Sequence, residues 1–516
     1  MTRRTASWIV VVLLAVIGLL PVLSMVFSTF HTEAGFSFEG YRQMLHTPSL
    51  WQSFGNSLLL AFTVASAATL AGTFLGILLE KTTLYFRKIW LALLLIPLLI
   101  PPYILAYGWY MLVGREGAWG EILFGFWGTA CILFSVYLPI AILITSVSLR
   151  TIDPRFEEAG LLVCPWRCVL SKITLVLMLP SAMVSFLLIF ILSMGEFSVA
   201  NFLRYDIFPM ESFIQFSAFY DFRTATLYAM PLLAIVLVIL GIESLLFKKG
   251  ALRFKSRTER LTIPLYALQI PFLVLIGTFI LIIIGMPLYG LMHSIDAQSF
   301  IHALHKAAPA LGQSLLYALL SALLLVFFGF ATAYIIVYRT IKGWRVLDAM
   351  NLFWFILPAT VIGIALILFW NRPYTNIIYA SPLIILFGYL VKYLFLSSKI
   401  IELRLSQIPR SFMEAAQLTG ASWYQILLYI LLPLSSGSLA AAGMIGFVFS
   451  LRESTLTMLV APAGTATLPV YIFTQMANGS EATVASLCLI MLLIVILPLL
   501  GLSGYTAYQG KKYDHA

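Results

Sequence analysis

The chain has 516 residues, of which 61% are hydrophobic and 10% are charged, and its formal net charge is +10. Ordinary soluble domains carry roughly 25% charged residues, and a soluble surface this poor in charge would expose large apolar patches. The composition therefore excludes an ordinary soluble protein and predicts an integral membrane protein. The four cysteines are too few and too scattered for a disulfide framework.

Apolar stretches of about 20 residues, which cross about 30 Å of hydrocarbon as helices, predict twelve transmembrane spans, six in each half of an all-α membrane protein. In the first half the expected spans are 7–30, 53–79, 89–113, 122–148, 181–203 and 225–247. In the second half they are 265–290, 312–337, 346–370, 378–398, 437–460 and 482–505. The first stretch is longer than a signal-peptide core and lacks a small-residue cleavage pattern, so we expect it to be retained.

The distribution of Lys and Arg predicts the orientation, because cytoplasmic loops carry the excess of these residues. With the N-terminus in the cytoplasm, the loops expected outside hold only Arg42, Arg115, Arg204, Arg223, Lys306 and Arg372. Both termini are then cytoplasmic. The basic residues are dispersed over many short loops, which argues against nucleic-acid binding.

Two kinds of residue inside the spans recur 257 positions apart. Pro101 and Pro358 predict a matched helix kink, with packing as its default role and a pathway lining as the alternative. Glu196 and Glu453 are ionisable groups within spans, which usually face the bundle interior or a water-filled path. We interpret them either as part of a translocation path or as a structural pair, with Arg452 beside Glu453.

A loop of about thirty residues between the fourth and fifth spans contains the string EEAGLLVCPW. Its candidate functional residues are Glu157, Glu158, Ala159, Val163 and Trp166. Cys164 and Cys168 are one helical turn apart, but no His or further Cys is near them, as a thiolate metal site would require. We expect free thiols and no metal.

The most polar stretch is 248–264, KKGALRFKSRTERLTIP, which carries six Lys and Arg residues. Its charge is typical of a cytoplasmic stop-transfer segment and linker. The predicted domains are therefore a first unit, 1–247, a cytoplasmic linker, 248–264, and a second unit, 265–516.

The corresponding loop of the second half reads EAAQLTGASW, and its candidate residues are Glu414, Ala415, Ala416, Gly420 and Trp423. The alanines favour a helix, and Gly420 can end that helix in the left-handed backbone conformation. Apolar residues resume after Trp423 as the stripe of a second helix. One such loop suits an ordinary amphipathic interfacial segment, whereas two at the same spacing favour a docking element.

The same displacement of 257 positions also carries Gly55 onto Gly312 and Ser57 onto Ser314, with no gap between landmarks. This regularity predicts two copies of one membrane unit joined end to end. Because six spans is an even number, both copies enter the membrane with the same orientation, related by an axis along the membrane normal.

The second loop, with Glu414-Ala415-Ala416, Gly420 and Pro433, resembles the EAA loop of binding-protein-dependent ABC import permeases. The resemblance implies two tandem six-helix type I permease units in a bacterial inner membrane. It also implies that each loop is a coupling helix seated in a cytoplasmic ABC ATPase dimer, and that a solute-binding protein docks outside. No cofactor is implied.

The first loop departs from this pattern. Glu158 stands where Ala is usual, Val163 replaces the Gly, and Val176 replaces the Pro. A β-branched Val is poorly suited to the left-handed turn that Gly permits. We therefore expect the first coupling helix to end differently and the two ATPase contacts to be unequal.

No G-x-x-x-x-G-K-[ST] pattern occurs, and the only Gly-Lys pair, Gly510-Lys511, is followed by Lys512. ATP hydrolysis is therefore expected in a separate subunit, and the chain itself is not expected to be an enzyme. A membrane-embedded enzyme is also disfavoured by the scarcity of intramembrane His, Asp and Glu.

Gly195-Glu196-Phe197 and the run 461–469, APAGTATLP, are most similar to ferric iron permeases. Related permeases for thiamine or 2-aminoethylphosphonate stay open as alternatives. A secondary transporter of the major facilitator type is the rival from another class. Its G-x-x-x-D-R signature has no match in the loop 80–88.

Overall fold

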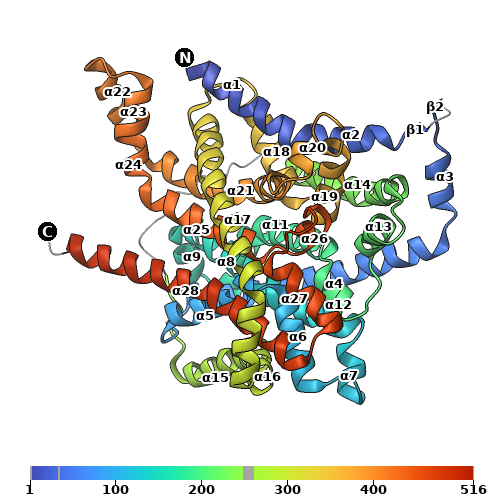
Figure 1. The fold of residues 1–516 in the computed structure, drawn as a ribbon. Coiled ribbons are helices and arrows are strands. Elements are labelled where there is room, and N and C mark those ends of the chain that lie inside the picture. Colours follow the sequence, from blue (N-terminus) through green and yellow to red (C-terminus); the bar gives the residue numbers. More distant parts are fainter. Residues whose placement is uncertain (1–2, 33–34, 248–260, 515–516) are drawn as a thin grey trace. The chain divides into compact units, whose positions relative to one another are not determined.

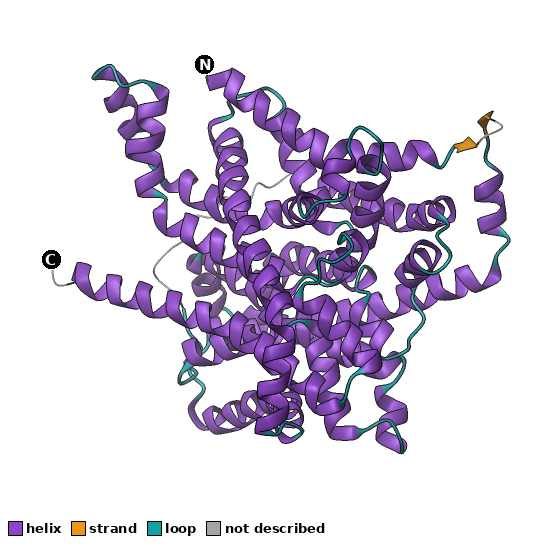
Figure 2. Ribbon diagram, viewed as in Figure 1, coloured by secondary structure: helices purple, strands orange, loops and turns teal. Residues whose placement is uncertain are grey.

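The computed structural model describes residues 3–32, 35–247 and 261–514, and most of these residues are helical (Figure 2). The two short strands β1 (His31–Thr32) and β2 (Gly35–Phe36) pair antiparallel. The predicted all-α fold class is confirmed.

The helices of residues 3–247 are α1 (Arg3–Leu14), the π-helix η1 (Ala15–Leu19), α2 (Leu20–Ser28), α3 (Glu39–Leu45), α4 (Pro48–Lys81), α5 (Arg87–Leu99), α6 (Pro102–Val113), α7 (Ala118–Leu123), α8 (Phe126–Thr151), α9 (Pro154–Leu161), α10 (Trp166–Val169), the π-helix η2 (Leu170–Thr174), α11 (Leu175–Met194), α12 (Ser198–Phe202), α13 (Phe208–Ser217) and α14 (Phe222–Phe247) (Figure 1).

The helices of residues 261–514 are the 3₁₀ turn η3 (Tyr266–Leu268), α15 (Gln269–Ile280), the π-helix η4 (Leu281–Gly285), α16 (Met286–His293), α17 (Ala297–Tyr338), α18 (Trp344–Ile356), α19 (Ala359–Trp370), α20 (Asn376–Tyr379), α21 (Leu383–Gln407), α22 (Arg410–Leu418), α23 (Trp423–Ile426), the π-helix η5 (Leu427–Leu431), α24 (Leu432–Leu434), α25 (Ser436–Arg452), α26 (Thr455–Val460), α27 (Leu468–Asn478) and α28 (Glu481–Asp514).

In the described part of the chain, nine continuous helices are long and apolar enough to cross a membrane, and three further helix pairs are bent within a break of a few residues. Counting each bent pair as one span gives the predicted twelve. The fifth and eleventh spans begin earlier than expected, at Trp166 and Trp423, because the helix after each loop continues through a π-turn directly into the membrane.

The predicted kinks at Pro101 and Pro358 are confirmed. The pair α5–α6 bends by 95° and the pair α18–α19 by 109°. Pro101 precedes α6 and Pro358 precedes α19 as buried N-cap residues. Because a proline supplies no N–H and disfavours helix in the residue before it, the first helix stops and a second starts in a new direction.

Helix bounds recur at the spacing found in the sequence. The helices α5 and α18 begin at Arg87 and Trp344 and end at Leu99 and Ile356, and both pairs of residues are 257 positions apart. The same holds for α6 with α19, α10 with α23 and η2 with η5. This agreement supports two copies of one unit.

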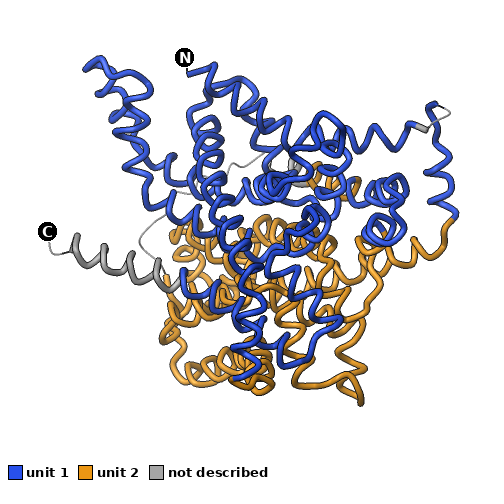
Figure 3. Tube along the Cα trace, viewed as in Figure 1, with its two compact units in different colours: residues 1–46, 212–233, 298–516 blue, residues 47–211, 234–297 orange. Residues whose placement is uncertain are grey.

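The described chain forms two compact units (Figure 3), which do not follow the sequence halves. Unit 1 contains residues 1–46, 212–233 and 298–516, and unit 2 contains residues 47–211 and 234–297. The first span therefore belongs to unit 1 and the seventh to unit 2. Most of the predicted linker 248–264 lies outside the described residues.

Unit 2 is built on α4 packed along α8. A methyl group at Gly72 would lie 2.3 Å from Ala141 Cβ, and one at Gly76 would lie 2.4 Å from Thr145 Cγ2. Only glycine allows this approach, as is common where membrane helices pack closely. Leu75, Leu138 and Ile276 belong to the apolar core that joins these helices to α15.

Unit 1 is centred on α17, α21 and α25. Its inner cluster contains Phe330, Ile401 and Ala442, and reaches Ile426 of α23 and Leu431 of η5, where the chain returns from the second loop. The first span packs against the same unit, because a methyl group at Gly18 would lie 2.7 Å from the fully buried Trp354. Apolar packing thus holds the second loop to the spans.

Candidate functional site

The loop of the first half that is predicted to contact an ATPase, called the first coupling loop below and defined as residues 153–169, is held by a buried charge. Glu157 on α9 is fully buried, and its Oε2 lies 2.5 Å from Nζ of Lys81 at the end of α4. Thr174 Oγ1 in η2 donates to the other carboxylate oxygen at 2.8 Å. Glu157 therefore fastens α9 both to a preceding span and to the span that follows.

The end of α4 is a junction for further contacts. Arg150 Nη2 of α8 lies 2.5 Å from Glu80 Oε1, next to the Lys81–Glu157 pair. The backbone N–H of Ile263 donates to the carbonyl of Lys81 at 2.7 Å, and Thr83 N–H donates to the carbonyl of Ile263 at 3.1 Å. Ile263, in the described end of the predicted linker, is thus attached beside the first coupling loop.

The outward face of the first loop carries a different carboxylate. Glu158 and Ala159 are exposed, whereas Glu157 is buried. Leu162 and Val163, in the turn after α9, are 89% and 88% exposed. Apolar side chains this exposed outside the spans are typical of a protein contact surface.

The turn after α9 forms without a left-handed residue, since Val163 is absent from the positions with positive φ in the described chain. The Cys164 N–H instead donates to the Gly160 carbonyl at 2.9 Å. The prediction of free thiols is wrong, because Cys164 and Cys168 are joined as a disulfide. Their Cα atoms are 6.0 Å apart, a separation that a disulfide spans.

The second coupling loop, defined here as residues 409–426, has the predicted helix, turn and helix. Gly420 has φ of +84° and ends α22 in the left-handed conformation, as a C-terminal glycine does. Ser422 and Gln425 form a reciprocal capping box at the start of α23. Figure 1 shows α22 and α23 at the tip of unit 1. A hollow of about 350 Å³ lies beside the turn that follows α22, lined by Gly420 and by Tyr429 of η5 among others.

The carboxylate of this loop faces outward. Glu414 and Ala415 are exposed, and Leu418 is 90% exposed. On the opposite side, Met413 and Ala416 pack against the inner apolar cluster of unit 1. Tyr338 also packs there and occupies the position equivalent to Lys81. The second loop is therefore held by apolar contacts, whereas the first is held by an ion pair.

The two loops also continue differently into their spans. The helix after the first loop runs without a break from Trp166 to Met194, whereas the corresponding helix after the second loop bends by 73° between Leu434 and Ser436. Pro433 and Gly437 flank this break, and such residues are the usual causes of sharp kinks. Val176 at the position of Pro433 allows the first helix to continue.

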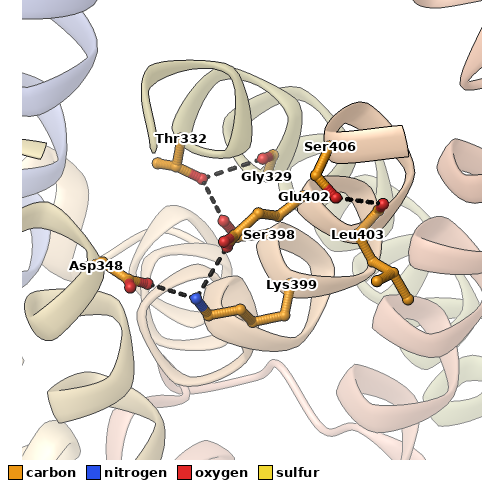
Figure 4. A network of polar contacts seen from close by, with 8 residues as sticks. All are labelled: Gly329, Thr332, Asp348, Ser398, Lys399, Glu402, Leu403 and Ser406. Carbon is orange, nitrogen blue, oxygen red and sulfur yellow. Dashed lines mark hydrogen bonds and ion pairs between the residues drawn. The ribbon is translucent and has the colours of Figure 1, made fainter. Parts of the chain in front are cut away.

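A polar network joins α21 to α18 in unit 1 (Figure 4). Lys399 Nζ of α21 lies 2.7 Å from Asp348 Oδ1 of α18 and 2.9 Å from Glu402 Oε2. In the first copy the positions of Asp348 and Lys399 hold Leu91 and Ile142, which belong to an apolar cluster. Each copy therefore fixes its helices with charges at a different place.

The two candidate path carboxylates accept hydrogen bonds close to a helix break. Glu196 Oε1 accepts from the Ser198 N–H at 2.9 Å and from the Ser198 hydroxyl. Glu453 accepts from the Leu456 N–H at 3.0 Å and from the Tyr393 hydroxyl. Each carboxylate thus accepts from a backbone N–H in the first turn of the short helix that follows it, where a negative charge stabilises the helix N-terminus.

Arg452 lies with its guanidinium 5.1 Å from the centre of the Phe449 ring. Within unit 2, α12 after Glu196 packs against α6 after Pro101. Within unit 1, α26 after Glu453 packs against α19 after Pro358. The structure therefore brings each carboxylate segment to the broken span of its own unit.

Sequence reasoning missed Lys392, a charged residue in the middle of α21. Its ammonium donates to the carbonyls of Phe355, at 3.3 Å, and of Leu357, which lie where α18 breaks before Pro358. A broken membrane helix needs donors for its freed carbonyls. A single Lys within an apolar run is the sequence feature that could have revealed this residue. The carbonyls that accept from it could not be predicted, because they depend on the tertiary fold.

The sequence landmarks Ser57 and Ser314 have matched roles that spacing alone did not reveal. Ser57 Oγ accepts from the N–H of Phe208, the first residue of α13, at 2.7 Å. Ser314 Oγ accepts from the N–H of Leu468, the first residue of α27, at 2.6 Å. The hydrogen bond of Ser57 thus links α13 to the long helix α4, and that of Ser314 links α27 to the long helix α17.

Residues 325–503 match the family described as "Binding-protein-dependent transport system inner membrane component". The chain is 24% identical to the Fe(3+)-transport system permease protein FbpB 2 of Haemophilus influenzae, with 99% of each chain covered. It is 23% identical to the ferric transport system permease protein FbpB of Actinobacillus pleuropneumoniae, over 89% of this chain and 72% of that protein.

A shorter similarity joins the chain to the spermidine/putrescine transport system permease protein PotC of Haemophilus influenzae. These proteins are 26% identical over 38% of this chain and 78% of the relative. The similarities to iron-transport proteins therefore extend over most of both chains, whereas this one covers less than half of this chain.

Proposed function

We propose that this chain belongs to the binding-protein-dependent family of inner-membrane transport components, which residues 325–503 match, and that it is the two-copy permease of an ATP-driven ferric iron importer. The observation that carries the proposal is similarity over 99% of its length to a Fe(3+)-transport permease. Shorter relatives that match only part of the chain favour the import class without favouring iron.

In this proposal, residues 1–247 and 265–516 are the two permease copies and 248–264 is the linker between them. Both termini and both coupling loops lie in the cytoplasm. A cytoplasmic ABC ATPase dimer supplies the energy, and a solute-binding protein delivers iron from outside. The excess of Lys and Arg in the loops on the proposed inner side supports this orientation.

Each coupling loop has features suited to docking. Both expose a carboxylate, Glu158 in the first and Glu414 in the second, together with apolar side chains such as Leu162 and Leu418. A protein interface commonly combines such apolar contacts with complementary charge. The proposed partner surface is a groove on each ATPase subunit.

The contacts that attach each coupling loop to the spans provide a route by which movement of the ATPase can reach the spans. When an ATPase subunit moves the first loop, the Lys81–Glu157 pair transmits the displacement to α4, and Thr174 transmits it to the following span. In the second loop, Met413 and Ala416 transmit it through the apolar cluster. Packed interfaces shift between discrete arrangements, which suits alternating access.

The translocation residues are proposed separately for each unit. Glu196 and Glu453 hold the short helices α12 and α26 against the broken spans that follow Pro101 and Pro358. Movement of a broken span would shift the position of its carboxylate. Arg452 next to Glu453 makes the second segment electrostatically different from the first.

Deleting the gene and measuring cellular uptake of radiolabelled ferric iron tests the substrate. Loss of iron uptake, restored by the wild-type gene, is expected. Thiamine, 2-aminoethylphosphonate and putrescine uptake are measured in parallel. Loss of one of these with iron uptake intact would reject ferric iron and retain the import class. ATP-independent uptake by the purified chain alone would reject the import class.

A further inference from the structure

A basic cavity lies at one end of the first span of unit 1. It has a volume of about 400 Å³ and is lined by Arg4, Trp8, Arg339, Thr340, Lys342 and Trp344, with Ile341. Arg4 and Trp8 come from α1, residues 339–342 come from the turn after α17, and Trp344 is the first residue of α18. Three cationic side chains thus meet in one hollow that has no carboxylate in its lining.

The two walls of the cavity are fixed to one another. Ser7 Oγ and Thr340 Oγ1 are 2.8 Å apart and form a hydrogen bond between α1 and the turn. Arg339 has φ of +50°, a left-handed conformation that is uncommon for a residue other than glycine. Its guanidinium lies 5.0 Å from the centre of the Trp344 ring. The cavity is therefore a defined arrangement of two segments far apart in the sequence.

The cationic groups of the cavity are available to a ligand. In the part of the chain that the structure describes, no carboxylate forms an ion pair with Arg4, Arg339 or Lys342. Glu402 lines a neighbouring cavity together with Arg339, but its carboxylate is already 2.9 Å from Lys399 Nζ. Guanidinium and ammonium groups are the usual ligands of phosphate oxygens.

The cavity adjoins an apolar stripe on the first span. Trp8, Ile9, Val12 and Leu13 of α1 are between 45% and 55% exposed. The cavity also lies at the ends of two predicted spans, α1 and α17, where Trp and basic residues mark the boundary between membrane and water. A ligand here meets cations at one end and an apolar surface along the helix.

From this arrangement we propose that the cavity binds the phosphate headgroup of an anionic phospholipid, whose acyl chain lies along the exposed stripe of α1. Basic pockets between transmembrane helices bind such headgroups. The charge and the adjoining apolar stripe favour a lipid over a free phosphate ion, which would use only the cavity. This inference does not depend on the transported solute.

The test uses the full-length chain in lipid nanodiscs, followed by native mass spectrometry with phosphatidylglycerol or phosphatidylcholine. We expect one phosphatidylglycerol to be retained more tightly than phosphatidylcholine. Changing both Arg339→Gln and Lys342→Gln should weaken this binding by roughly ten- to thirty-fold, at about 1 kcal/mol for each basic residue. The matched control changes Arg87→Gln and Lys88→Gln, which lie outside the cavity at the start of α5, and should retain binding.

Equal retention of the two lipids by the wild-type chain, or equal phosphatidylglycerol binding by the Arg339/Lys342 variant, would overturn the proposal. Inorganic phosphate is added as a competitor. Full displacement of the lipid by millimolar phosphate would also overturn it, because it would identify a site for a free anion. If the double variant does not fold, Arg4→Gln alone should give a partial loss, and unchanged binding by that variant counts against the site.

Discussion

Lys81 and Glu157 form an ion pair in the interior of unit 2, with 2.5 Å between Nζ and Oε2 and with side chains that are 5% and 0% exposed. The pair joins the end of α4 to the first coupling loop. Its equivalent positions in the second half hold Tyr338 and Glu414, and Glu414 is exposed. One glutamate of the repeated motif is thus a structural anchor, while its counterpart is open to a partner.

The substitution Lys81→Met should be strongly destabilising, because it leaves the carboxylate of Glu157 buried and unpaired. Breaking a buried pair by removing one partner typically costs about 3–5 kcal/mol. Thermal unfolding of the purified chain in detergent measures this loss. The double variant with Glu157→Gln should recover most of the stability, and Glu414→Gln alone should unfold like the wild type. Equal destabilisation by Lys81→Met and Glu414→Gln would contradict the asymmetry.

The substitution Gly420→Ala should loosen the turn of the second loop, because its φ of +84° is unfavourable for a residue with a Cβ atom. The expected cost is about 1–2 kcal/mol, visible as faster hydrogen exchange of the α22 amides. Gly420→Asn should be milder, since Asn tolerates this conformation.

The equivalent substitution in the first loop, Val163→Ala, is the matched control for Gly420→Ala. Val163 does not have a positive φ, so exchange of the α9 amides should stay unchanged. Faster exchange in both loops would show that the turns are stabilised in the same way, contrary to the structure.

The substitution Lys392→Met should destabilise the break between α18 and α19, because the carbonyls of Phe355 and Leu357 lose their ammonium donor. Leaving such groups without a partner costs about 1–3 kcal/mol. The control is Ser135→Ala at the equivalent position of the first copy, where the hydroxyl donates to the Cys131 carbonyl of its own helix. A drop in unfolding temperature confined to Lys392→Met is expected; matching drops would argue against a special role.

The substitutions Ser57→Ala and Ser314→Ala should each leave a buried backbone N–H without its acceptor, at Phe208 and Leu468 respectively. The expected loss is about 1–3 kcal/mol for each. Ser24→Ala serves as control, since its hydroxyl only donates to the Pro21 carbonyl one turn away. Two losses of similar size would support matched roles in the two copies, whereas a loss at only one serine would contradict them.

Features determined by local sequence could be predicted. The spans follow from apolar length, the breaks at Pro101 and Pro358 from the missing N–H groups, and the left-handed turn at Gly420 from the absence of a Cβ atom. The unequal ends of the coupling helices likewise followed from Val163 and Gly420. These features depend on neighbours within a few positions along the chain.

Features that depend on distant contacts could not be predicted. The partner of Glu157 lies 76 positions away at Lys81, so the sequence could not show that this glutamate is buried and that Glu158 faces outward. The disulfide between Cys164 and Cys168 was missed because their spacing fits two free thiols equally well. The compact units were also missed, since the first span belongs to the unit that contains most of the second half.

The most direct test of the proposed docking by both coupling loops measures how strongly this chain stimulates ATP hydrolysis by a co-purified ATPase. The variant with both Glu158→Gln and Glu414→Gln should lose most of the stimulation while its unfolding temperature stays that of the wild type. The variant with both Lys81→Met and Glu157→Gln removes the buried ion pair but leaves the outward carboxylates of Glu158 and Glu414 unchanged. It should still bind the ATPase. Wild-type assembly and stimulation by the Glu158/Glu414 variant would contradict the account.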